Sequence, residues 1–188
     1  MPEIVVCRHA ATEHNLAKRF ISTTDLPLSA HGRAQCEGLR EALCRFSFKR
    51  CVVSPMRRCL ETRELAASGV PFEIEPALRE TDFGSWEGWT LEWAELQAPQ
   101  LLAQRRLDPV GFRPPGGESI EDAAERLRPV AQKLRGEDST LVIGHRVTLG
   151  ILERLLRDLP LDSKEVGGLE PAEFTVVRVP ERRSVTER

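Results

Sequence analysis

Short apolar runs alternate along the chain with longer segments in which apolar residues recur at helical spacing. The short runs have the length and β-branched content of strands, at residues 3–7, 51–53, 72–74, 140–143 and 174–179. The longer segments predict helices at residues 30–46, 55–68 and 91–106, one that opens at Ser119, and one at 147–157. This alternation favours an α/β fold, a three-layer α/β/α sandwich with a mostly parallel sheet and a small inserted cap.

Local signals predict where some helices begin and break. The first long helix follows a segment of turn composition, residues 15–28, and Ser29 is a suitable N-cap for it. Ser54 and the proline after it predict that the second helix starts at that proline. Pro129 lies inside the fourth predicted helix, and we expect it to kink or split that helix near Leu127.

Length and composition indicate one ordinary globular domain. The chain has 188 residues, of which 40% are hydrophobic and 30% charged. We expect a single domain over residues 1–180, with residues 80–130 as the cap. The charged residues 181–188 are expected to fray.

The charged, apolar and cysteine residues indicate which kinds of partner and which cellular compartment to expect. A net charge of −2 does not favour a nucleic acid, and the absence of an apolar run of about 18 residues predicts no membrane span. The start of the chain lacks the pattern of a secretory signal, so the expected address is the cytoplasm. An odd number of cysteines without C-x-x-C spacing predicts reduced thiols and no zinc site, at positions 7, 36, 44, 51 and 59.

Three predicted strands end on polar residues of related chemistry. The first strand leads directly into Arg8 and His9, the second into Ser54 and then Arg57 and Arg58, and the fourth into His145. Because the carboxyl ends of parallel strands meet at one edge of a sheet, we expect two imidazoles and two guanidiniums around one pocket. Arginine forks match phosphate oxygens, so this set predicts a phosphoryl site.

A histidine beside arginines can act as a nucleophile on phosphorus. The arginines would lower the pKa of His9 by charge repulsion and keep the imidazole neutral near pH 7. The leaving oxygen then needs a proton, for which Glu80 is the best candidate, since a carboxylic acid beneath a cap can have a raised pKa. Asp82 and Glu87 are the competing carboxylates. The spacing of the four histidines does not suit a metal, so we expect no metal site.

These residues resemble those of a known family. Residues 8–15, RHAATEHN, are similar to the R-H-G-x-T-x-x-N motif of the histidine phosphatase (phosphoglycerate mutase-like) superfamily. Five further segments match its other motifs in order: residues 15–32, 54–62, 78–88, 115–119, and the pair 144–145. The resemblance implies a phosphoglycerate mutase-like fold and an enzyme of the small phosphatase branch.

The resemblance also implies roles for individual residues. His9 would carry the phosphoryl group, which Arg8, Arg58 and His145 would bind, and Glu80 would be the proton donor. Asn15 would contact the phosphate, and Ser22, which replaces a glycine of the phosphate-side loop, is the remaining candidate for substrate binding.

The implied reaction is hydrolysis of a small phosphomonoester through a phosphohistidine, without a cofactor. The length is closer to that of an α-ribazole phosphatase than to that of a mutase, whose cap is longer. Phosphoglycerate mutase-type transfer and a catalytically weak phospho-ligand-binding module are the alternatives, and a homodimer is possible. His14 and His31 are expected to have no chemical role.

Departures from the family pattern concern the pocket. Ala10 replaces the usual glycine after the histidine, and its methyl is expected either to crowd the pocket or to shift the backbone. Arg146 follows His145 where a small residue is usual, and either adds a cation or points to solvent. Three tryptophans of the cap form either a packed face or a wall of the pocket, at positions 86, 89 and 93.

Overall fold

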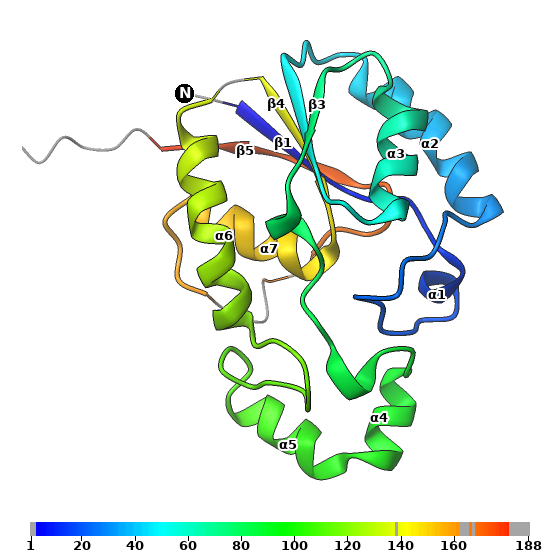
Figure 1. The fold of residues 1–188 in the computed structure, drawn as a ribbon, viewed down its shortest axis with the longest axis vertical. Coiled ribbons are helices and arrows are strands. Elements are labelled where there is room, and N and C mark those ends of the chain that lie inside the picture. Colours follow the sequence, from blue (N-terminus) through cyan, green and yellow to red (C-terminus); the bar gives the residue numbers. More distant parts are fainter. Residues whose placement is uncertain (1–2, 138, 162–165, 167, 181–188) are drawn as a thin grey trace, which may run out of the picture.

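The structure, a computed structural model, describes residues 3–137, 139–161, 166 and 168–180. A five-stranded sheet lies at its centre, in the order β3-β2-β4-β1-β5 (Figure 1). The strands are β1 (Glu3–Arg8), β2 (Arg50–Val53), β3 (Phe72–Ile74), β4 (Thr140–Gly144) and β5 (Phe174–Arg178). The first four are parallel, and β5 pairs antiparallel with β1. The predicted α/β fold with a mostly parallel sheet is therefore confirmed.

Helices cover both faces of this sheet. The helices of the described residues are α1 (Glu13–Leu16), α2 (Ala30–Leu43), α3 (Arg57–Ala67), α4 (Leu91–Gln97), α5 (Pro99–Leu107), α6 (Ile120–Arg135) and α7 (Arg146–Leu156). The helices α2 and α3 lie on one face, and α6 and α7 lie on the other (Figure 1). Two short 3-10 turns follow β3, at Pro76–Leu78 and Gly84–Trp86.

Alternation along the strands divides the core into two layers. Val5 and Cys7 of β1 pack toward α2 and α3, whereas Ile4 and Val6 pack toward α6 and α7. All four are at most 1% exposed. Because successive side chains point to opposite faces, a strand buried on both sides reads as a continuous apolar run, which is why these strands could be found from the sequence.

The loop after β1 is held tightly against α2. Ser29 caps this helix, as predicted: its Oγ accepts the Gly32 N–H at 3.0 Å and donates to the Ala11 carbonyl oxygen at 3.0 Å. A Cβ at Gly32 would lie 2.0 Å from that same oxygen, so only glycine permits this approach. The contact fixes the backbone just beyond His9.

Three predicted helix boundaries were wrong. The helix α3, which we predicted to begin at Pro55, begins at Arg57. The reason is that the Ser54 hydroxyl bonds to His145 and does not cap the helix. The helix predicted at 91–106 is two helices, separated at Ala98, because Pro99 starts α5. A short helix, α1, overlaps the first two residues of the segment 15–28 that we predicted as turns.

Pro129 does not split α6, which runs unbroken from Ile120 to Arg135. Its start is secured by a capping box, in which Ser119 accepts from the Asp122 N–H and Asp122 accepts from the Ser119 N–H. A long buried face on both sides of the proline, including Leu127 and Val130, compensates for the lost backbone bond.

The cap extends beyond the carboxyl ends of the strands, with α4 and α5 at its far end (Figure 1). It has its own small apolar core around Trp86, which is 1% exposed, with Phe20, Phe83 and Phe112 packed against it. Trp93 instead is 49% exposed. Residues 181–188 lie outside the described residues. None of the helices in the described ranges is long and apolar enough to cross a membrane.

Candidate active site

His9 and His145 meet because their strands are neighbours in register. Arg8, the last residue of β1, pairs with Gly144, the last residue of β4, and each histidine is the next residue of its chain segment. The His9 N–H donates to the Gly144 carbonyl oxygen at 3.0 Å, and the two imidazole centroids are 5.2 Å apart. The structure thus brings together the two histidines that the sequence placed at one sheet edge.

The ring of His9 has a defined tautomer. Its Nδ1 lies 2.7 Å from the Ala10 carbonyl oxygen, which can only accept, so Nδ1 carries the hydrogen. The other ring nitrogen, Nε2, therefore has a free lone pair. Burial, and then the charges of Arg58 and Arg8, hold the pKa of His9 well below its usual range. A neutral imidazole with Nε2 unprotonated is the form that can attack phosphorus.

His145 has the opposite tautomer. Arg58 donates from Nε to Nδ1 of His145 at 3.2 Å, so the hydrogen of this ring is on Nε2, which bonds to the Ser54 hydroxyl oxygen at 2.8 Å. Burial, followed by the charges of Arg58, His9 and Arg8, lowers the pKa of His145 well below its usual range. Ser54 is thus a site residue whose contact with His145 we did not predict.

Arg58 has no exposed surface and holds the loop in front of it. Its Nη1 donates to the Thr24 carbonyl oxygen at 3.0 Å, and its Nη2 donates to the Ser22 carbonyl oxygen at 2.9 Å. With the bond from Nε to His145, three of the five N–H groups of a guanidinium are engaged. Within the described part of the chain, the second N–H of each terminal nitrogen has no hydrogen-bond partner.

Arg8 is held from the opposite side. Its Nη1 donates to the Leu169 carbonyl oxygen at 2.8 Å and lies 3.8 Å from a carboxylate oxygen of Glu170, and its buried Nε has no partner. Burial is the main cause that lowers the pKa of this guanidinium. A buried guanidinium with unused donors favours an anionic ligand, because an unmatched charge inside a protein is costly.

Glu80 is 6% exposed and accepts four hydrogen bonds. Its Oε1 accepts from the Thr81 N–H, the Thr148 N–H and the Thr148 hydroxyl, at 3.0, 3.1 and 3.0 Å. Its Oε2 accepts only from the Val147 N–H, at 3.2 Å. The N-terminus of α7 therefore holds this carboxyl group, and among the described residues one lone pair of Oε2 stays without a donor.

Glu87 and Asp82, the two other candidates for the proton donor, make hydrogen bonds to the backbone of loops and turns. Both oxygens of Glu87 accept from the Ser22 N–H, and one accepts from the Ser22 hydroxyl at 2.5 Å. Burial raises the pKa of Glu87, but the hydrogen bonds from Ser22 and Thr24 outweigh it and lower this pKa. Asp82 accepts from the Gly84 N–H and shapes a turn. Neither carboxylate lines the cavity over His9.

Asn15 and Ser22 are placed differently. The Asn15 side chain lines the cavity with His9, and its Oδ1 accepts from the N–H and the hydroxyl of Thr12, both at 2.9 Å. Ser22 is 2% exposed, its hydroxyl donates to Glu87 and accepts from the Phe83 N–H, and it does not reach the cavity. The expectation that Ser22 binds substrate is not supported by this placement, because its polar groups already connect the loop to the cap.

The three departures from the family pattern are accommodated. The methyl of Ala10 packs in the core beneath α2 and α3 and not in the cavity, and its φ lies outside the left-handed region. Its N–H donates to the Thr62 hydroxyl at 3.0 Å, a contact that the sequence analysis missed although Thr62 lies in a quoted motif. Arg146 lines the cavity and pairs with Glu170 at 3.4 Å.

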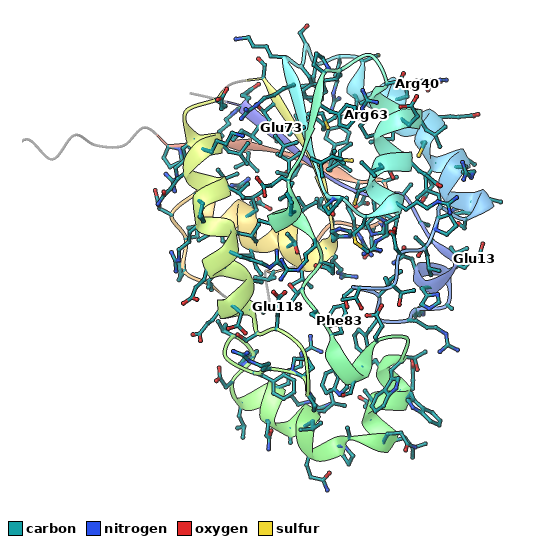
Figure 2. The ribbon with its side chains drawn as sticks, viewed as in Figure 1. Glu13, Arg40, Arg63, Glu73, Phe83 and Glu118 are labelled. Carbon is teal, nitrogen blue, oxygen red and sulfur yellow. The ribbon has the colours of Figure 1, made fainter. Side chains whose placement is uncertain are left out.

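These groups surround an open cavity of about 780 Å³ beneath the cap, within the roughly 300–1,000 Å³ range of small-molecule sites. Arg8, His9, Asn15 and Glu80 line it, whereas Arg58 and His145 are packed behind His9 without exposed surface. Figure 2 shows Phe83, which also lines the cavity, between the sheet and the cap helices. In the described residues, no three His, Cys, Asp or Glu side chains form a group that could hold a metal ion.

The lowered pKa values of His9 and His145 predict how stability depends on pH. The unfolded chain binds protons at both imidazoles below about pH 6.5, whereas the folded chain does so only at a lower pH. The free energy of unfolding should therefore be highest above about pH 6.5. Below that value it should decrease as the pH falls, by up to about 1.4 kcal/mol per pH unit for each histidine. Urea unfolding between about pH 7 and pH 5 measures this.

The variant His9→Asn removes one of the two groups, so its stability should depend less steeply on pH than that of the wild type. His31→Asn, an exchange at an exposed position of α2, is the control and should keep the full slope. Equal slopes for wild type and His9→Asn would contradict the assignment of a buried neutral imidazole to His9.

Comparisons with known proteins agree with this geometry. The family model "Histidine phosphatase superfamily (branch 1)" matches residues 4–188. A 6-phosphofructo-2-kinase/fructose-2,6-bisphosphatase of Gallus gallus is 35% identical over 94% of this chain, which spans only 37% of that protein. Glucosyl-3-phosphoglycerate phosphatase of Mycolicibacterium vanbaalenii is 33% identical, over 91% of this chain and 81% of that protein.

A solved structure of a mycobacterial glucosyl-3-phosphoglycerate phosphatase, in complex with VO3, has the same fold. It superposes with a TM-score of 0.84 and 28% identity, and the alignment covers 94% of this chain and 90% of that one. The family model spans nearly the whole chain. The chain belongs to the histidine phosphatase superfamily, branch 1.

Proposed function

We propose that this protein hydrolyses phosphomonoesters of small metabolites through a phosphohistidine at His9, without a metal ion. The bond from Nδ1 of His9 to the Ala10 carbonyl oxygen carries this proposal, because it leaves Nε2 as a neutral nucleophile. The family supports the reaction class, and the relatives whose names describe phosphatases of small phosphorylated compounds support the substrate class.

The reaction divides into two transfers. In the first, Nε2 of His9 forms a bond to phosphorus while the ester P–O bond breaks, and the leaving oxygen takes a proton from Oε2 of Glu80. In the second, the Glu80 carboxylate accepts a proton from water, whose oxygen attacks the phosphohistidine and releases inorganic phosphate. Arg8 and Arg58 match the charge on the phosphoryl oxygens in both transfers.

Phosphate release from p-nitrophenyl phosphate in the presence of EDTA tests the proposal. We expect turnover to be the same with and without the chelator, and we expect an acid-labile, alkali-stable phosphoenzyme after rapid mixing with a labelled ester. Loss of activity in EDTA would refute the metal-free mechanism. Failure to hydrolyse any of several phosphomonoesters would instead favour a phospho-ligand-binding module.

Arginine and lysine side chains outnumber carboxylates in the wall of the cavity, five to two, which favours a substrate with a second anionic group. Arg105 of α5 lines both this cavity and an adjoining one of about 70 Å³, and its guanidinium lies over the ring of Trp86. In the part of the chain that the structure describes, no carboxylate pairs with it, and burial lowers its pKa. An unpaired, half-buried cation is a suitable partner for a carboxylate or phosphate on the leaving group.

The variant Arg105→Met should therefore lower kcat/KM for ω-carboxyalkyl phosphates about 10–100-fold, the value of a charge-assisted hydrogen bond, and leave alkyl phosphates of the same length unaffected. Arg106→Met is the matched control, because Arg106 is 74% exposed and pairs with Glu95 at 3.6 Å. Equal losses for both ester series would contradict a role of Arg105 in recognising the second charge.

We also propose a cytoplasmic address. All five cysteines are free thiols, and all but Cys44 are buried. Reduced thiols are typical of proteins that work in a reducing compartment.

A further inference from the structure

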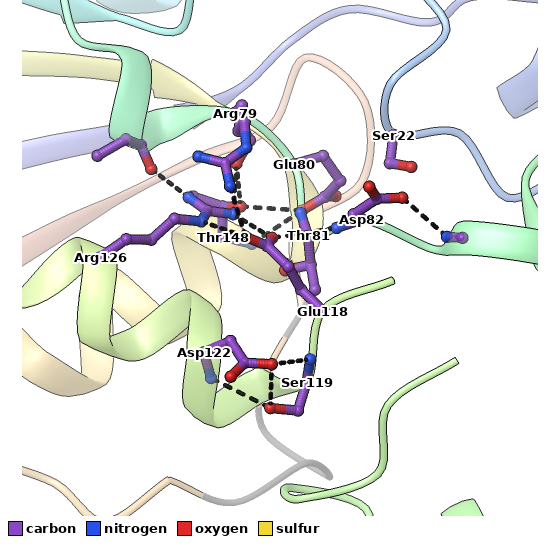
Figure 3. A network of polar contacts seen from close by, with 12 residues as sticks. Ser22, Arg79, Glu80, Thr81, Asp82, Glu118, Ser119, Asp122, Arg126 and Thr148 are labelled. Carbon is purple, nitrogen blue, oxygen red and sulfur yellow. Dashed lines mark hydrogen bonds and ion pairs between the residues drawn. The ribbon is translucent and has the colours of Figure 1, made fainter. Parts of the chain in front are cut away.

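A polar network ties the loop of Glu80 to the start of α6 (Figure 3). Its centre is Glu118, which lies in the segment between the cap and α6. One carboxylate oxygen of Glu118 accepts from Arg79 at 2.5 Å and from Nε of Arg126 at 3.1 Å. The other accepts from Nη2 of Arg126 at 3.0 Å and from the Asp82 N–H at 3.2 Å. Arg126 thus holds Glu118 with two parallel hydrogen bonds.

Arg126 also reaches the backbone on the near side of Glu80. It donates from Nη1 to the Ala77 carbonyl oxygen and from Nη2 to the Arg79 carbonyl oxygen, the latter at 3.0 Å. Glu118 holds the far side through the Asp82 N–H. The six-residue stretch from Ala77 to Asp82 is therefore fixed before and after Glu80 by one ion pair.

This pair differs from the surface ion pairs of the molecule. The side chains of Arg126 and Glu118 are only 14% and 16% exposed. Neither lines the cavity over His9, so neither touches the reacting atoms directly. A largely buried and bidentate pair is better explained by the geometry that it enforces than by a gain in stability, because desolvation cancels most of its Coulombic attraction.

The backbone that Arg126 holds also contacts a group that binds Glu80, the Thr148 hydroxyl. The Thr148 hydroxyl, which bonds to Oε1 of Glu80, also lies 2.8 Å from the Arg79 carbonyl oxygen. That carbonyl oxygen is one of the two held by Arg126. A change in the Arg126 contact would move the loop and the hydroxyl that orients the carboxyl group together.

We propose that the Glu118–Arg126 pair positions Glu80 for proton transfer to the leaving group. This inference rests on the proposed function, in which Glu80 is the proton donor. A displacement of a reacting group by about 1 Å can cost roughly 10²-fold in rate. The cost depends on the ester: an alkoxide must be protonated as it leaves, whereas p-nitrophenolate is a stable anion that leaves without help.

The test compares alkyl phosphates with p-nitrophenyl phosphate in the variants Glu118→Gln and Arg126→Met. We expect each to lower kcat/KM, which reports the first transfer, for alkyl phosphates about 10–100-fold, with little change in kcat/KM for p-nitrophenyl phosphate. Since both variants break one pair, the double variant should lose no more than either single variant. Glu80→Gln sets the reference, because it removes the proton donor itself.

Matched controls come from the same helix. Glu121→Gln and Arg128→Met exchange exposed residues of α6 and should leave both esters unaffected. Arg126→Lys keeps the charge but cannot bond in two parallel directions, so it should show a smaller version of the same selective loss even if Arg126→Met fails to fold.

The outcomes separate the two proposals. Parallel losses for both kinds of ester, or no loss for either, in a folded Glu118→Gln protein would overturn the positioning role. If Glu80→Gln itself shows no dependence on the leaving group, then the role of Glu80 in the proposed function is wrong. If Glu80→Gln is selective and Glu118→Gln is not, only the inference about the pair fails.

Discussion

Substitution of His9 by alanine is expected to lower kcat for any phosphomonoester by at least roughly 10⁴-fold, because it removes the nucleophile of the first transfer and with it the phosphohistidine that the second transfer needs. No other imidazole can take its place. His145, whose ring centroid is 5.2 Å away, holds its Nε2 hydrogen toward Ser54, and its Nδ1 lone pair faces Arg58. Its ring is also fully buried, whereas the ring of His9 borders the cavity.

The measurement is steady-state release of phosphate together with trapping of labelled phosphoenzyme. Wild type should show the phosphohistidine, and His9→Ala should show none. His31→Ala, on the exposed side of α2, is the control and should retain both activity and labelling. Unchanged turnover in His9→Ala would sink the nucleophile assignment, and labelling at an unchanged level would show that another residue carries the phosphoryl group.

The sequence was sufficient for the parts of the site that depend on strand ends. The β-branched runs identify β1 and β4, and parallel pairing then brings Arg8, His9 and His145 to one edge. The same reasoning places Arg57 and Arg58 near this edge, because their helix follows β2, and only the motif resemblance selects Arg58. The position of a residue at the end of a short strand and the order of the strands in the sheet determine these placements. The apolar pattern of the sequence indicates both.

The contacts of Glu80 could not be predicted in this way. Its carboxylate accepts hydrogen bonds from Val147 and Thr148 at the start of α7. These residues lie 67 and 68 positions further along the chain. Ser54 illustrates the same limit. Serine before proline usually caps a helix, but here His145 approaches from the neighbouring strand and takes the hydroxyl. Propensity describes local alternatives, and a tertiary partner decides between them.

Ser22 shows why position near a site is not evidence of contact with substrate. Glu87 satisfies its N–H and hydroxyl, and Arg58 takes its carbonyl oxygen, so the residue connects the loop, the cap and the guanidinium. Hydrogen bonds thus connect Glu87 to Arg58 through Ser22 and also through Thr24. This arrangement makes the loop a support for Arg58 rather than a wall of the pocket.

Arg58→Lys should lower kcat/KM by about 10²–10³-fold, although the charge is kept. A lysine ammonium cannot bond to His145, to the Thr24 carbonyl oxygen and to a phosphoryl oxygen in fixed directions at once. At least one buried carbonyl group then lacks a donor, which costs about 1–3 kcal/mol of stability. The adjacent Arg57→Lys is a closely matched control, because Arg57 is 57% exposed and pairs only with Glu61 on the surface.

Activity on p-nitrophenyl phosphate, affinity for inorganic phosphate and urea unfolding together test this prediction. For Arg58→Lys we expect weaker phosphate binding, lower kcat/KM and a lower unfolding midpoint, whereas Arg57→Lys should change stability by less than about 0.5 kcal/mol. The losses of stability and of activity would have one origin. The N–H groups of Arg58 that bind the loop carbonyl oxygens also fix the direction of the N–H groups proposed to bind the phosphate. A loss of stability with full activity would therefore mean that the guanidinium supports the loop alone and that Arg8 binds the phosphoryl group without it.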